Sequence, residues 1–507
     1  MHTAHTTERA GPWAWAGLAA MSLPIFMLAT DMTVLFLALP SLSADLAPTG
    51  AQQLWILHIG EFLSAASVIT FGLLTNRLGR RRLLLAAVLV YGAASLLAAF
   101  AATAEMLIVA RALLGIAGAA FTPAGLALLR MMFRSTREFS VAFAVFMAAF
   151  TGGAAAGPPL GGLLLEHFWW GSVFLVNVPA ALALLLAGPI LLPRDRPDPS
   201  VRVDLVSVVL SIAMVMALVH GLQETADSGF APLPALSTLT GAVLVVFFLR
   251  RQARSAHPLV PLSLFTPKVF RVLVVVLFAA SVGMGATDMF VTQLLQVVVG
   301  MSALQVGLLM LGPAAGGILG TLLTPVVQRL VSPAPALAGT LVLMGLSALA
   351  AVAPLGVHDP IGLVAAITVM TVSGSVFMTT ASQLLITSAP EEHTGSATAV
   401  QDVFAGLGNA AGMAFIGSLG IAVYRAVLET GAPAGLDPAD AESAQGSVGA
   451  AAAVAERLGG EAGQALMEAV RPAFTLATQT TFVAAGLTGA ALAVVVALRL
   501  RGTEYTH

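Results

Sequence analysis

The chain has 507 residues, of which 58% are hydrophobic and 9% are charged, and its mean hydropathy is +0.94. Soluble domains carry roughly one-quarter charged residues, so this composition excludes a soluble protein and predicts an all-α integral membrane protein. The net charge is −2 and the 23 basic residues are scattered, which excludes an extended nucleic-acid-binding surface. Cysteine is absent, which excludes disulfides, thiolate metal sites and cysteine nucleophiles.

Apolar stretches long enough to cross a bilayer recur along the whole chain. A helix needs about 20 residues to span about 30 Å of hydrocarbon. Fourteen stretches meet this requirement, and they are predicted at 13–39, 54–75, 83–103, 105–129, 139–163, 170–192, 203–220, 234–250, 270–298, 305–327, 335–354, 361–386, 395–424 and 475–498. The polar start of the chain carries only Arg9 as a basic residue, so the first stretch is interpreted as an uncleaved span and not as a signal peptide.

Basic residues fall in alternate loops between these stretches. They follow spans two, four, six, eight and ten, and they also flank the first and last spans, as Arg9, Arg77, Arg80, Arg81, Arg82, Arg130, Arg134, Arg137, Arg194, Arg196, Arg202, Arg250, Arg251, Arg254, Lys268, Arg271, Arg329, Arg499 and Arg501. Cytoplasmic loops retain an excess of Lys and Arg. Both termini are therefore predicted to lie in the cytoplasm, and the protein is predicted to lie in the cytoplasmic membrane.

The spans and loops predict a chain of two similar halves. We expect a cytoplasmic tail over 1–12, a six-helix bundle over 13–192, two additional transmembrane helices over 203–250, a second six-helix bundle over 270–498 and a cytoplasmic tail over 499–507.

The second bundle contains a long polar interruption before its last span. Residues 428–474 are rich in Ala, Gly and acidic side chains, and they are expected to form a solvated external loop. Short helices are expected between Ala444 and Val470, and a gating flap is the alternative interpretation of this segment.

Few ionisable side chains lie inside the predicted spans, because placing a charged side chain in the membrane costs about 2.5–3.5 kcal/mol. They are candidates for proton and substrate coupling, and they are Asp31, His58, Glu61, Arg111, Asp288 and Asp402. The first four are predicted at similar depth in the external half of the membrane. Asp402 is predicted nearer the cytoplasmic half.

Two of these residues predict a local pair. His58 and Glu61 are three residues apart, so they share one helix face, where imidazole and carboxylate can exchange a proton. A carboxylate in a low-dielectric cavity has a raised pKa, so it binds a proton near physiological pH and releases it when a cation arrives. This competition is the physical basis of antiport. A proton moving inward gains about 2.3 kcal/mol per 100 mV, so one or two sites drive export.

Other candidates also have structural interpretations. Arg111 is suited to tying helices together through backbone carbonyls and Asp31. Asp288 ends the small-residue stretch that begins at Gly283, where a helix can break or approach a neighbour. Asn177 and Gln296 are uncharged and are expected to contact neighbouring helices.

Four stretches carry a resemblance to a known family. They are Asp31-Met-Thr-Val-Leu-Phe-Leu-Ala-Leu-Pro40, Gly72-Leu-Leu-Thr-Asn-Arg-Leu-Gly-Arg-Arg81, Arg111-Ala-Leu-Leu-Gly-Ile-Ala-Gly118 and Gly153-Ala-Ala-Ala-Gly-Pro-Pro-Leu-Gly-Gly162. The chain resembles the fourteen-span drug:proton antiporters of the major facilitator superfamily, which include pumps for quaternary ammonium compounds. The resemblance covers nearly all of the chain and implies the major facilitator fold, with two six-helix bundles plus two extra helices.

The resemblance also implies roles for individual residues. Asp31 is expected to bind protons or cations, and Arg111 is linked to proton transfer. The loop motif, which latches the cytoplasmic side of the halves, comprises Gly72, Asn76, Arg77, Gly79 and Arg80. The fifth-span antiporter motif, which accompanies export, comprises Gly153, Gly157, Pro158 and Gly161.

Several positions depart from the family pattern. Asn76 stands where the family has aspartate, which removes a charge pair from the latch. His58 stands where relatives have an acid, and Glu61 follows one turn later. Gly171 occupies the place of an arginine, and Asp402 is the retained acid of a pair. The proton pathway is therefore expected to be rearranged.

The sequence thus predicts a proton-coupled antiporter that exports hydrophobic, often cationic drugs. The expected partners are small-molecule substrates and the lipid bilayer, without nucleic acid, and the expected oligomeric state is a monomer. No cofactor apart from the proton and no enzymatic activity are expected, because the sequence shows no metal-ligand constellation, phosphate-binding loop or nucleophile motif. The alternatives are a dedicated exporter of one metabolite or antibiotic, a channel and a membrane enzyme.

Overall fold

The computed structural model of the protein is helical throughout the part of the chain that it describes. It describes residues 11–133, 135–195, 197, 204–228, 232–255, 258, 262–389, 394–431, 433 and 436–500. These residues form helices, turns and short links, without a β-strand. The predicted all-α class is confirmed.

The first part of the chain folds into α1 to α8. In chain order these are α1 (Pro12–Leu46), α2 (Gly50–Leu78), α3 (Arg80–Ala99), α4 (Ala104–Gly118), α5 (Phe121–Met132), α6 (Thr136–His167), α7 (Ser172–Leu175) and α8 (Asn177–Leu191). Two predicted spans are each divided into two helices, because α4 continues as α5 and α7 continues as α8 with a short break in each case.

The remainder of the chain folds into α9 to α22. In chain order these are α9 (Leu205–Ser228), α10 (Pro232–Arg254), η1 (Leu262–Phe265), α11 (Lys268–Met284), α12 (Thr287–Gln293), the π-helical turn η2 (Leu294–Val298), α13 (Ala303–Leu309), α14 (Leu311–Leu330), α15 (Pro333–Ala350), α16 (Val352–Gly356), α17 (Pro360–Thr387), α18 (Thr394–Gly412), the π-helical turn η4 (Met413–Gly417), α19 (Ser418–Gly431), α20 (Pro438–Gly446), α21 (Val448–Leu458) and α22 (Gly460–Arg499).

Most of the predicted spans coincide with long apolar helices. Within the described part of the chain, 12 helical segments are long and apolar enough to cross a membrane. Two shorter apolar helical stretches, Trp55–Val68 and Val206–Gly221, coincide with the predicted second and seventh spans. The protein is therefore a multi-pass membrane protein.

The segment over 428–474 is more regular than the loop that the sequence predicts. Its described residues include two short helices, α20 and α21, and the first part of α22, which begins at Gly460 where the predicted span begins at 475. Leu466 and Val470 are buried, and this part of α22 packs against α21, so burial of an apolar face keeps the segment helical. The 40 residues of α22 span about 60 Å, twice the hydrocarbon thickness.

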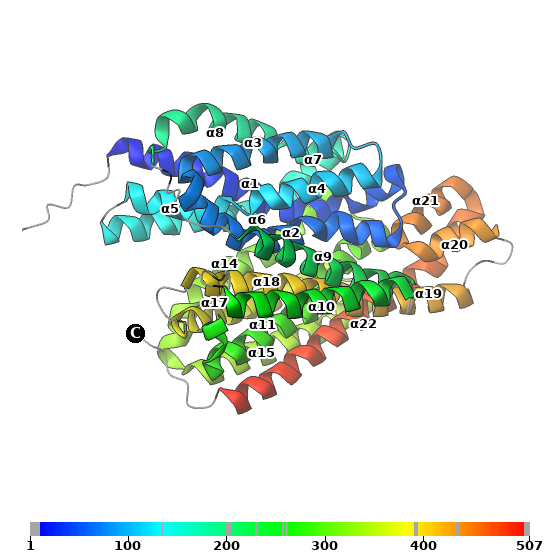
Figure 1. Ribbon diagram of the computed structural model, residues 1–507. Helices are drawn as coiled ribbons and strands as arrows, with labels where there is room; N and C mark the ends of the chain where they lie inside the picture. Colours follow the sequence, from blue (N-terminus) through cyan, green and yellow to red (C-terminus); the bar gives the residue numbers. More distant parts are fainter. Residues whose placement is uncertain are drawn as a thin grey trace, which may run out of the picture.

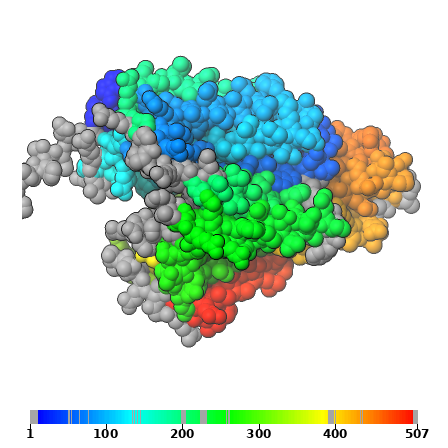
Figure 2. All heavy atoms as spheres, in the orientation of Figure 1, coloured from blue at the N-terminus to red at the C-terminus, as the bar shows by residue number. Residues whose placement is uncertain are grey.

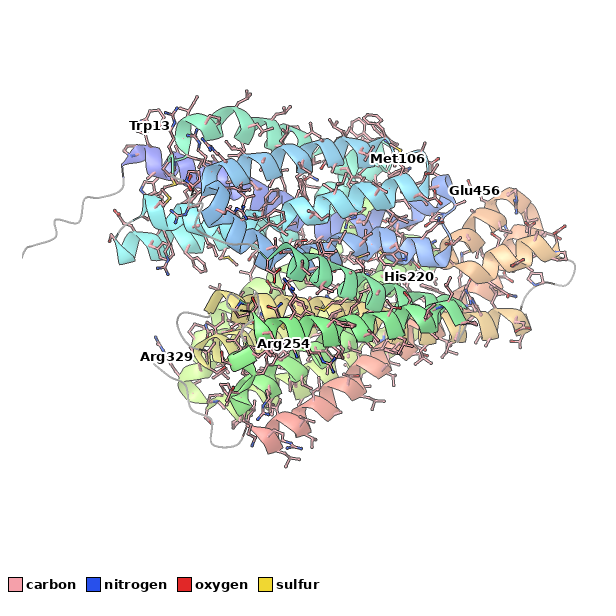
Figure 3. The ribbon with its side chains drawn as sticks, viewed as in Figure 1. Trp13, Met106, His220, Arg254, Arg329 and Glu456 are labelled. Atoms are coloured by element: carbon pink, nitrogen blue, oxygen red, sulfur yellow. The ribbon has the colours of Figure 1, made fainter. Side chains whose placement is uncertain are left out.

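The helices form two groups that lie side by side (Figure 1). One group contains α1 to α8, and the other contains α11 to α15, α17, α18 and α22. The space-filling view shows the same two groups, with α20 and α21 projecting at one end (Figure 2). We call α20 and α21 the cap, the end that carries them the cap end, and the opposite end the termini end. Figure 3 shows Glu456 at the cap end and Trp13 and Arg329 at the termini end.

The α9–α10 hairpin lies against the seam between the two groups. α9 packs against α2 and also against α18. Phe62, Ala66, Val215 and Val219 form a buried apolar cluster between α2 and α9, and Leu407 of α18 packs on it. Arg251, near the end of α10, is linked to Asp204, which directly precedes α9. Its guanidinium donates two hydrogen bonds of 2.8 Å to the Asp204 carboxylate. These bonds hold the pKa of the Asp204 carboxyl well below its usual range.

The cap is attached to α19 by a buried hydrogen bond. The hydroxyl of Tyr424 donates to the carbonyl oxygen of Ala444 in α20 at 2.8 Å. An ion pair between Arg457 and Asp440 links α20 to α21. Within the first half, the hydroxyl of the buried Tyr91 has no hydrogen-bond partner among the described residues. The hydroxyl of Tyr424 is therefore hydrogen-bonded and that of Tyr91 is not, so a substitution of Tyr91 is a suitable control for a substitution of Tyr424.

Replacement of Tyr424 by phenylalanine is expected to loosen the cap. It leaves the buried carbonyl of Ala444 without its donor, at a cost of about 0.5–1.5 kcal/mol. Hydrogen exchange of residues 438–446 in nanodiscs should accelerate in Y424F. In the control Y91F, exchange of the same segment should be unchanged, because that substitution removes an unpaired hydroxyl. Equal exchange in Y424F and wild type would contradict the attachment.

Candidate functional site

A buried ion pair joins α1 to α4. Asp31 and Arg111 are 5% and 3% exposed, and the guanidinium of Arg111 donates to Oδ2 of Asp31. The same guanidinium donates to the backbone carbonyls of Ile56 at 3.0 Å and Leu57 at 3.3 Å, both in α2. A buried charge needs such partners, because an unpaired one is very costly. Arg111 therefore ties three helices together, as the structural interpretation of the sequence predicted.

Two glycines explain why the Arg111 side chain reaches the α2 backbone. α2 and α4 cross at Gly60 and Gly115, and a Cβ atom on Gly115 would lie 2.5 Å from the Cα of Gly60. Only glycine permits such a close approach. The crossing thus places the guanidinium of Arg111 directly on the turn of α2 that precedes His58.

His58 and Glu61 meet on one face of α2, as their spacing predicted. Nδ1 of His58 is 3.5 Å from Oε2 of Glu61. His58 is 3% exposed, and neither ring nitrogen has a hydrogen-bond partner among the described residues. Its ring stacks on Phe62 at 5.9 Å between centroids and is tilted against Phe36 of α1 at 6.4 Å. The imidazole is therefore held in an aromatic environment with one carboxylate as its polar neighbour.

Asp288 and Asp402 are two accessible carboxylates within the predicted spans of the second group. α11 and α12 are separated at Gly285 and Ala286, and Asp288 lies in the first turn of α12. Its neighbours Thr287 and Met289 are buried, whereas Asp288 is exposed. Asp402 in α18 is also exposed.

The antiporter motif joins α6 to α1. A Cβ atom on Gly153, Gly157 or Gly161 would overlap atoms of α1, including Oγ1 of Thr33. Thr30 donates to the carbonyl of Gly153 at 3.1 Å, beside Asp31 in sequence. The small residues therefore let α6 hold the helix that carries Asp31 in place.

The same motif also contacts the second group of helices. A Cβ atom on Gly307 of α13 would overlap the carbonyl of Pro158, and one on Gly162 would lie 2.6 Å from the Cα of Leu304. Near the cap, a Cβ on Gly449 would meet Ser43 of α1 at 3.9 Å. These contacts join the two groups toward the cap end.

The loop motif is organised around Gly79, which has φ +92° between α2 and α3. Asp195, which follows α8, accepts hydrogen bonds from the backbone N–H groups of Arg80 and Arg81 at the first turn of α3. Arg77 is exposed, and Gly72 faces open space. The side chain of Asn76 lies outside the described residues.

The sequence analysis missed Asp195. Its signal is an acid flanked on both sides by arginine, Arg194 and Arg196, in the loop after α8. Gly79 has a positive φ, a conformation that favours glycine. The Asp195 carboxylate beside it accepts hydrogen bonds from N–H groups in the first turn of α3, which have no partner within the helix.

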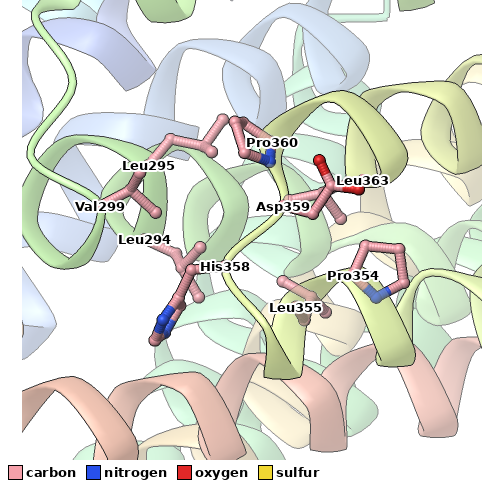
Figure 4. A pocket seen from close by; sticks show the side chains of 9 residues that line it. All are labelled: Leu294, Leu295, Val299, Pro354, Leu355, His358, Asp359, Pro360 and Leu363. Atoms are coloured by element: carbon pink, nitrogen blue, oxygen red, sulfur yellow. The ribbon is translucent and has the colours of Figure 1, made fainter.

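A small depression in the second group is not the candidate site. It is lined mainly by apolar side chains around the turn between α16 and α17, with His358 and Asp359 at its edge (Figure 4). His358 is bonded to Thr475 at 2.8 Å. The empty volume of about 150 Å³ is below the roughly 300–1,000 Å³ of small-molecule sites.

Comparison with known proteins identifies the family. The model of the Major Facilitator Superfamily matches residues 21–413, which is more than half of the chain. The chain belongs to the major facilitator superfamily. Proteins of this superfamily are transporters, in agreement with the many membrane-spanning helices.

Two curated relatives cover almost the whole chain. The multidrug efflux pump LfrA of Mycolicibacterium smegmatis is 35% identical over 98% of this chain and 98% of its own length. The methyl viologen resistance protein SmvA of Salmonella typhimurium is 34% identical over 93% of this chain and 95% of its own. The fold is similar to a crystal structure of a bacterial homolog of the human lysosomal transporter Spinster, with a TM-score of 0.66 at 18% identity over 98% and 100% of the two chains.

Replacement of Gly115 by alanine is expected to separate α4 from α2. The added methyl overlaps Gly60, so the crossing must open and Arg111 must lose its bonds to Ile56 and Leu57, at a cost of about 1–3 kcal/mol. The melting temperature in detergent should fall. Gly339→Ala in α15 is the control, because its new methyl meets open space and alanine favours a helix. A G115A protein as stable as G339A would contradict this account.

Removal of the Asp195 carboxylate is expected to fray α3. D195A leaves the N–H groups of Arg80 and Arg81 without their acceptor, at a cost of about 0.5–2 kcal/mol. Hydrogen exchange at residues 80–83 should become faster. The exposed Glu456 provides the control, since E456A should leave this segment unchanged. Protection of residues 80–83 equal to wild type would show that Asp195 does not stabilise the turn.

Proposed function

We propose that the protein is a proton-coupled antiporter that exports hydrophobic, often cationic compounds across the cytoplasmic membrane. The observation that carries this proposal is the set of carboxylates within the membrane-spanning helices: Asp31 buried with Arg111, and Asp288 and Asp402 exposed on α12 and α18. Carboxylates in such positions are rare, and they bind either a proton or a cation. The names of LfrA and SmvA, an efflux pump and a resistance protein, support the same class of substrate.

The orientation of the protein in the membrane follows from the distribution of basic residues. Arg77, Arg130, Arg254 and Arg329 lie at helix ends that the positive-inside rule places in the cytoplasm. We therefore place the termini end in the cytoplasm and the cap end outside. In this orientation the contacts of Gly162 and Gly307 hold the external ends of the two groups together.

The proposed transport mechanism involves no metal ion, no enzymatic step and no second copy of the chain. Within the described residues, no group of three or more His, Asp and Glu side chains could hold a metal ion. Transport by alternating access needs no cofactor besides the coupling proton and no enzymatic step. Each chain contains two groups of helices with carboxylates in both, so a monomer is the proposed functional unit.

A dedicated exporter of one antibiotic is the second candidate. The tetracenomycin C resistance and export protein of Streptomyces glaucescens is 30% identical over 82% of this chain and 78% of its own length. The replacement of an acid by His58 in the candidate site is compatible with a narrower substrate range. Competition of a compound panel against one labelled substrate separates the two candidates.

Efflux of ethidium driven by a pH gradient tests the proposal in proteoliposomes. The wild type should move ethidium and protons in opposite directions, and an uncoupler should abolish both fluxes. D31N and D402N remove two acids of the candidate site, so both should lose coupled proton flux. Lumenal pH and ethidium fluorescence are recorded together.

The exposed Glu105 in the first turn of α4 provides the matched control. E105Q removes a carboxylate outside the candidate site and should retain coupled flux. Ethidium efflux that survives the uncoupler would exclude proton coupling. A wild type that moves neither ethidium nor protons would leave the dedicated exporter as the better account.

A further inference from the structure

Two helices of the second group are interrupted, and both interruptions have a cause in the sequence. Gly285 and Ala286 separate α11 from α12, and Met310 separates α13 from α14. Glycine weakens a helix because it loses more conformational freedom on folding than other residues. Pro313, in the first turn of α14, has no N–H to donate to the carbonyl of Leu309, so α13 and α14 cannot form one regular helix.

The chain between the two interruptions makes close contacts with the first group of helices. We call this segment, which consists of α12, η2, the link 299–302 and α13, the arm. A Cβ atom on Gly162 of α6 would lie 2.6 Å from the Cα of Leu304 in the arm, and a Cβ atom on Gly307 of the arm would overlap the carbonyl of Pro158. The arm and α6 therefore meet through backbone atoms and small residues.

The first interruption is a defined pivot. A Cβ atom on Gly285 would lie 2.6 Å from the carbonyl oxygen of Asn409 in α18, so only glycine lets the break approach α18 this closely. The hydroxyl of Thr287 donates to the carbonyl oxygen of Met284 at 2.9 Å. Broken helices persist in membranes where side chains satisfy the backbone groups that the break frees. The chain can therefore bend here while its neighbours remain folded.

Phe290 holds the arm to its own group close to this pivot. Its ring stacks on Phe474 of α22 with centroids 5.3 Å apart, and a Cβ atom on Gly420 of α19 would lie 2.6 Å from the ring. Phe290 is only five residues beyond Gly285, or about 7.5 Å along the helix. Gln296 is eleven residues beyond Gly285, and it donates to the carbonyl of Leu37 in α1 at 3.4 Å. A swing at the pivot therefore moves the contact with α1 much more than the contact with α22.

We propose that the arm swings at these two interruptions and serves as the external gate on the side of α1 and α6, while α11 and α14 keep their places in the second group. Both of these helices are held there, since α11 packs along α18 and α14 packs along α17. In the orientation given above the contacts of the arm lie on the external side, so its swing opens that side. The inference goes beyond the proposed function and applies to a carrier of either candidate substrate.

A contact made by glycines is suited to repeated opening. Helices in a membrane are held together by close packing and hydrogen bonds, because the lipid is as apolar as the side chains between them. Separation of Gly162 from Leu304 and of Gly307 from Pro158 exposes little side-chain surface to the external cavity. The arm can therefore leave α6 and return without repacking large side chains.

Distances between pairs of spin labels in nanodiscs test the inference. The chain contains no cysteine, so introduced cysteines are the sole labelling sites. Leu308 of the arm, Ile361 of α17 and Ala102 between α3 and α4 are exposed. The pair L308C and I361C reports movement of the arm within the second group. The pair I361C and A102C reports the separation of the two groups.

Replacement of Gly162 by valine forces the arm away from α6. Its Cβ alone would lie 2.6 Å from the Cα of Leu304, whereas non-bonded carbon atoms need about 3.5–4.0 Å. The L308C–I361C distance should therefore shift by about 1 Å or more, and the I361C–A102C distance should stay as in the wild type. G152V on the same helix is the control, because a Cβ atom there meets nothing within 4 Å. G162A provides a milder variant with a smaller shift in the same direction.

Replacement of Pro313 by alanine tests the second pivot. Alanine supplies the missing N–H and favours a helix, so α13 and α14 should become one continuous helix. In the double variant of G162V with P313A, the shift of the L308C–I361C distance should be lost, and the I361C–A102C distance should lengthen instead. P325A is the control, because α14 already continues through Pro325.

An unchanged L308C–I361C distance in both G162V and G162A would overturn the inference, whether or not the I361C–A102C distance grows. Equal distance shifts with P313A and with P325A would exclude Met310 as a pivot.

Ethidium efflux shows whether transport uses the swing. P313A should slow efflux several-fold relative to P325A, and equal rates would overturn the role of the arm as a gate. Absence of efflux from the wild type would count against the proposed function alone, because the label distances depend neither on the substrate nor on protons.

Discussion

The burial of the Asp31–Arg111 ion pair is the constraint on which the rest of the candidate site depends. A guanidinium in a membrane interior needs hydrogen-bond acceptors, and each of the three nitrogens of Arg111 donates to one of them, the Asp31 carboxylate or a carbonyl of α2. That geometry requires α2 and α4 to cross at Gly60 and Gly115. It also requires α1 to be held firmly, which the glycines of α6 accomplish.

The two groups of helices contribute chemistry of different kinds. The first group holds its charges in fixed pairs, Asp31 with Arg111 and His58 with Glu61, within hydrogen-bonded or aromatic surroundings. The second group presents the accessible carboxylates Asp288 and Asp402. Charges in both groups are useful to a transporter. The electrostatic interaction between the two groups then changes when one group moves relative to the other.

Much of this arrangement was predictable from local sequence. The six ionisable residues were found because charged side chains are rare in apolar stretches, and the i, i+3 spacing predicted the contact of His58 with Glu61. The break before Asp288 was predictable from its small residues. Asp195 was missed because an acid in a loop is common. Short helices were expected between Ala444 and Val470, but the continuation of one of them into the last span as α22 was not predicted, because its apolar residues are mixed with Gly and Glu.

The sequence by itself determined the membrane location, the positions of the spans and the identity of the charged candidates, because hydropathy and the cost of buried charge act on each segment separately. Only the tertiary structure decided which residues of different helices meet. The contacts of Arg111 with Ile56 and Leu57, of Gly307 with Pro158, and of Gln296 with Leu37 join residues far apart in the chain. Such contacts depend on how helices cross and in which register, which no local pattern specifies.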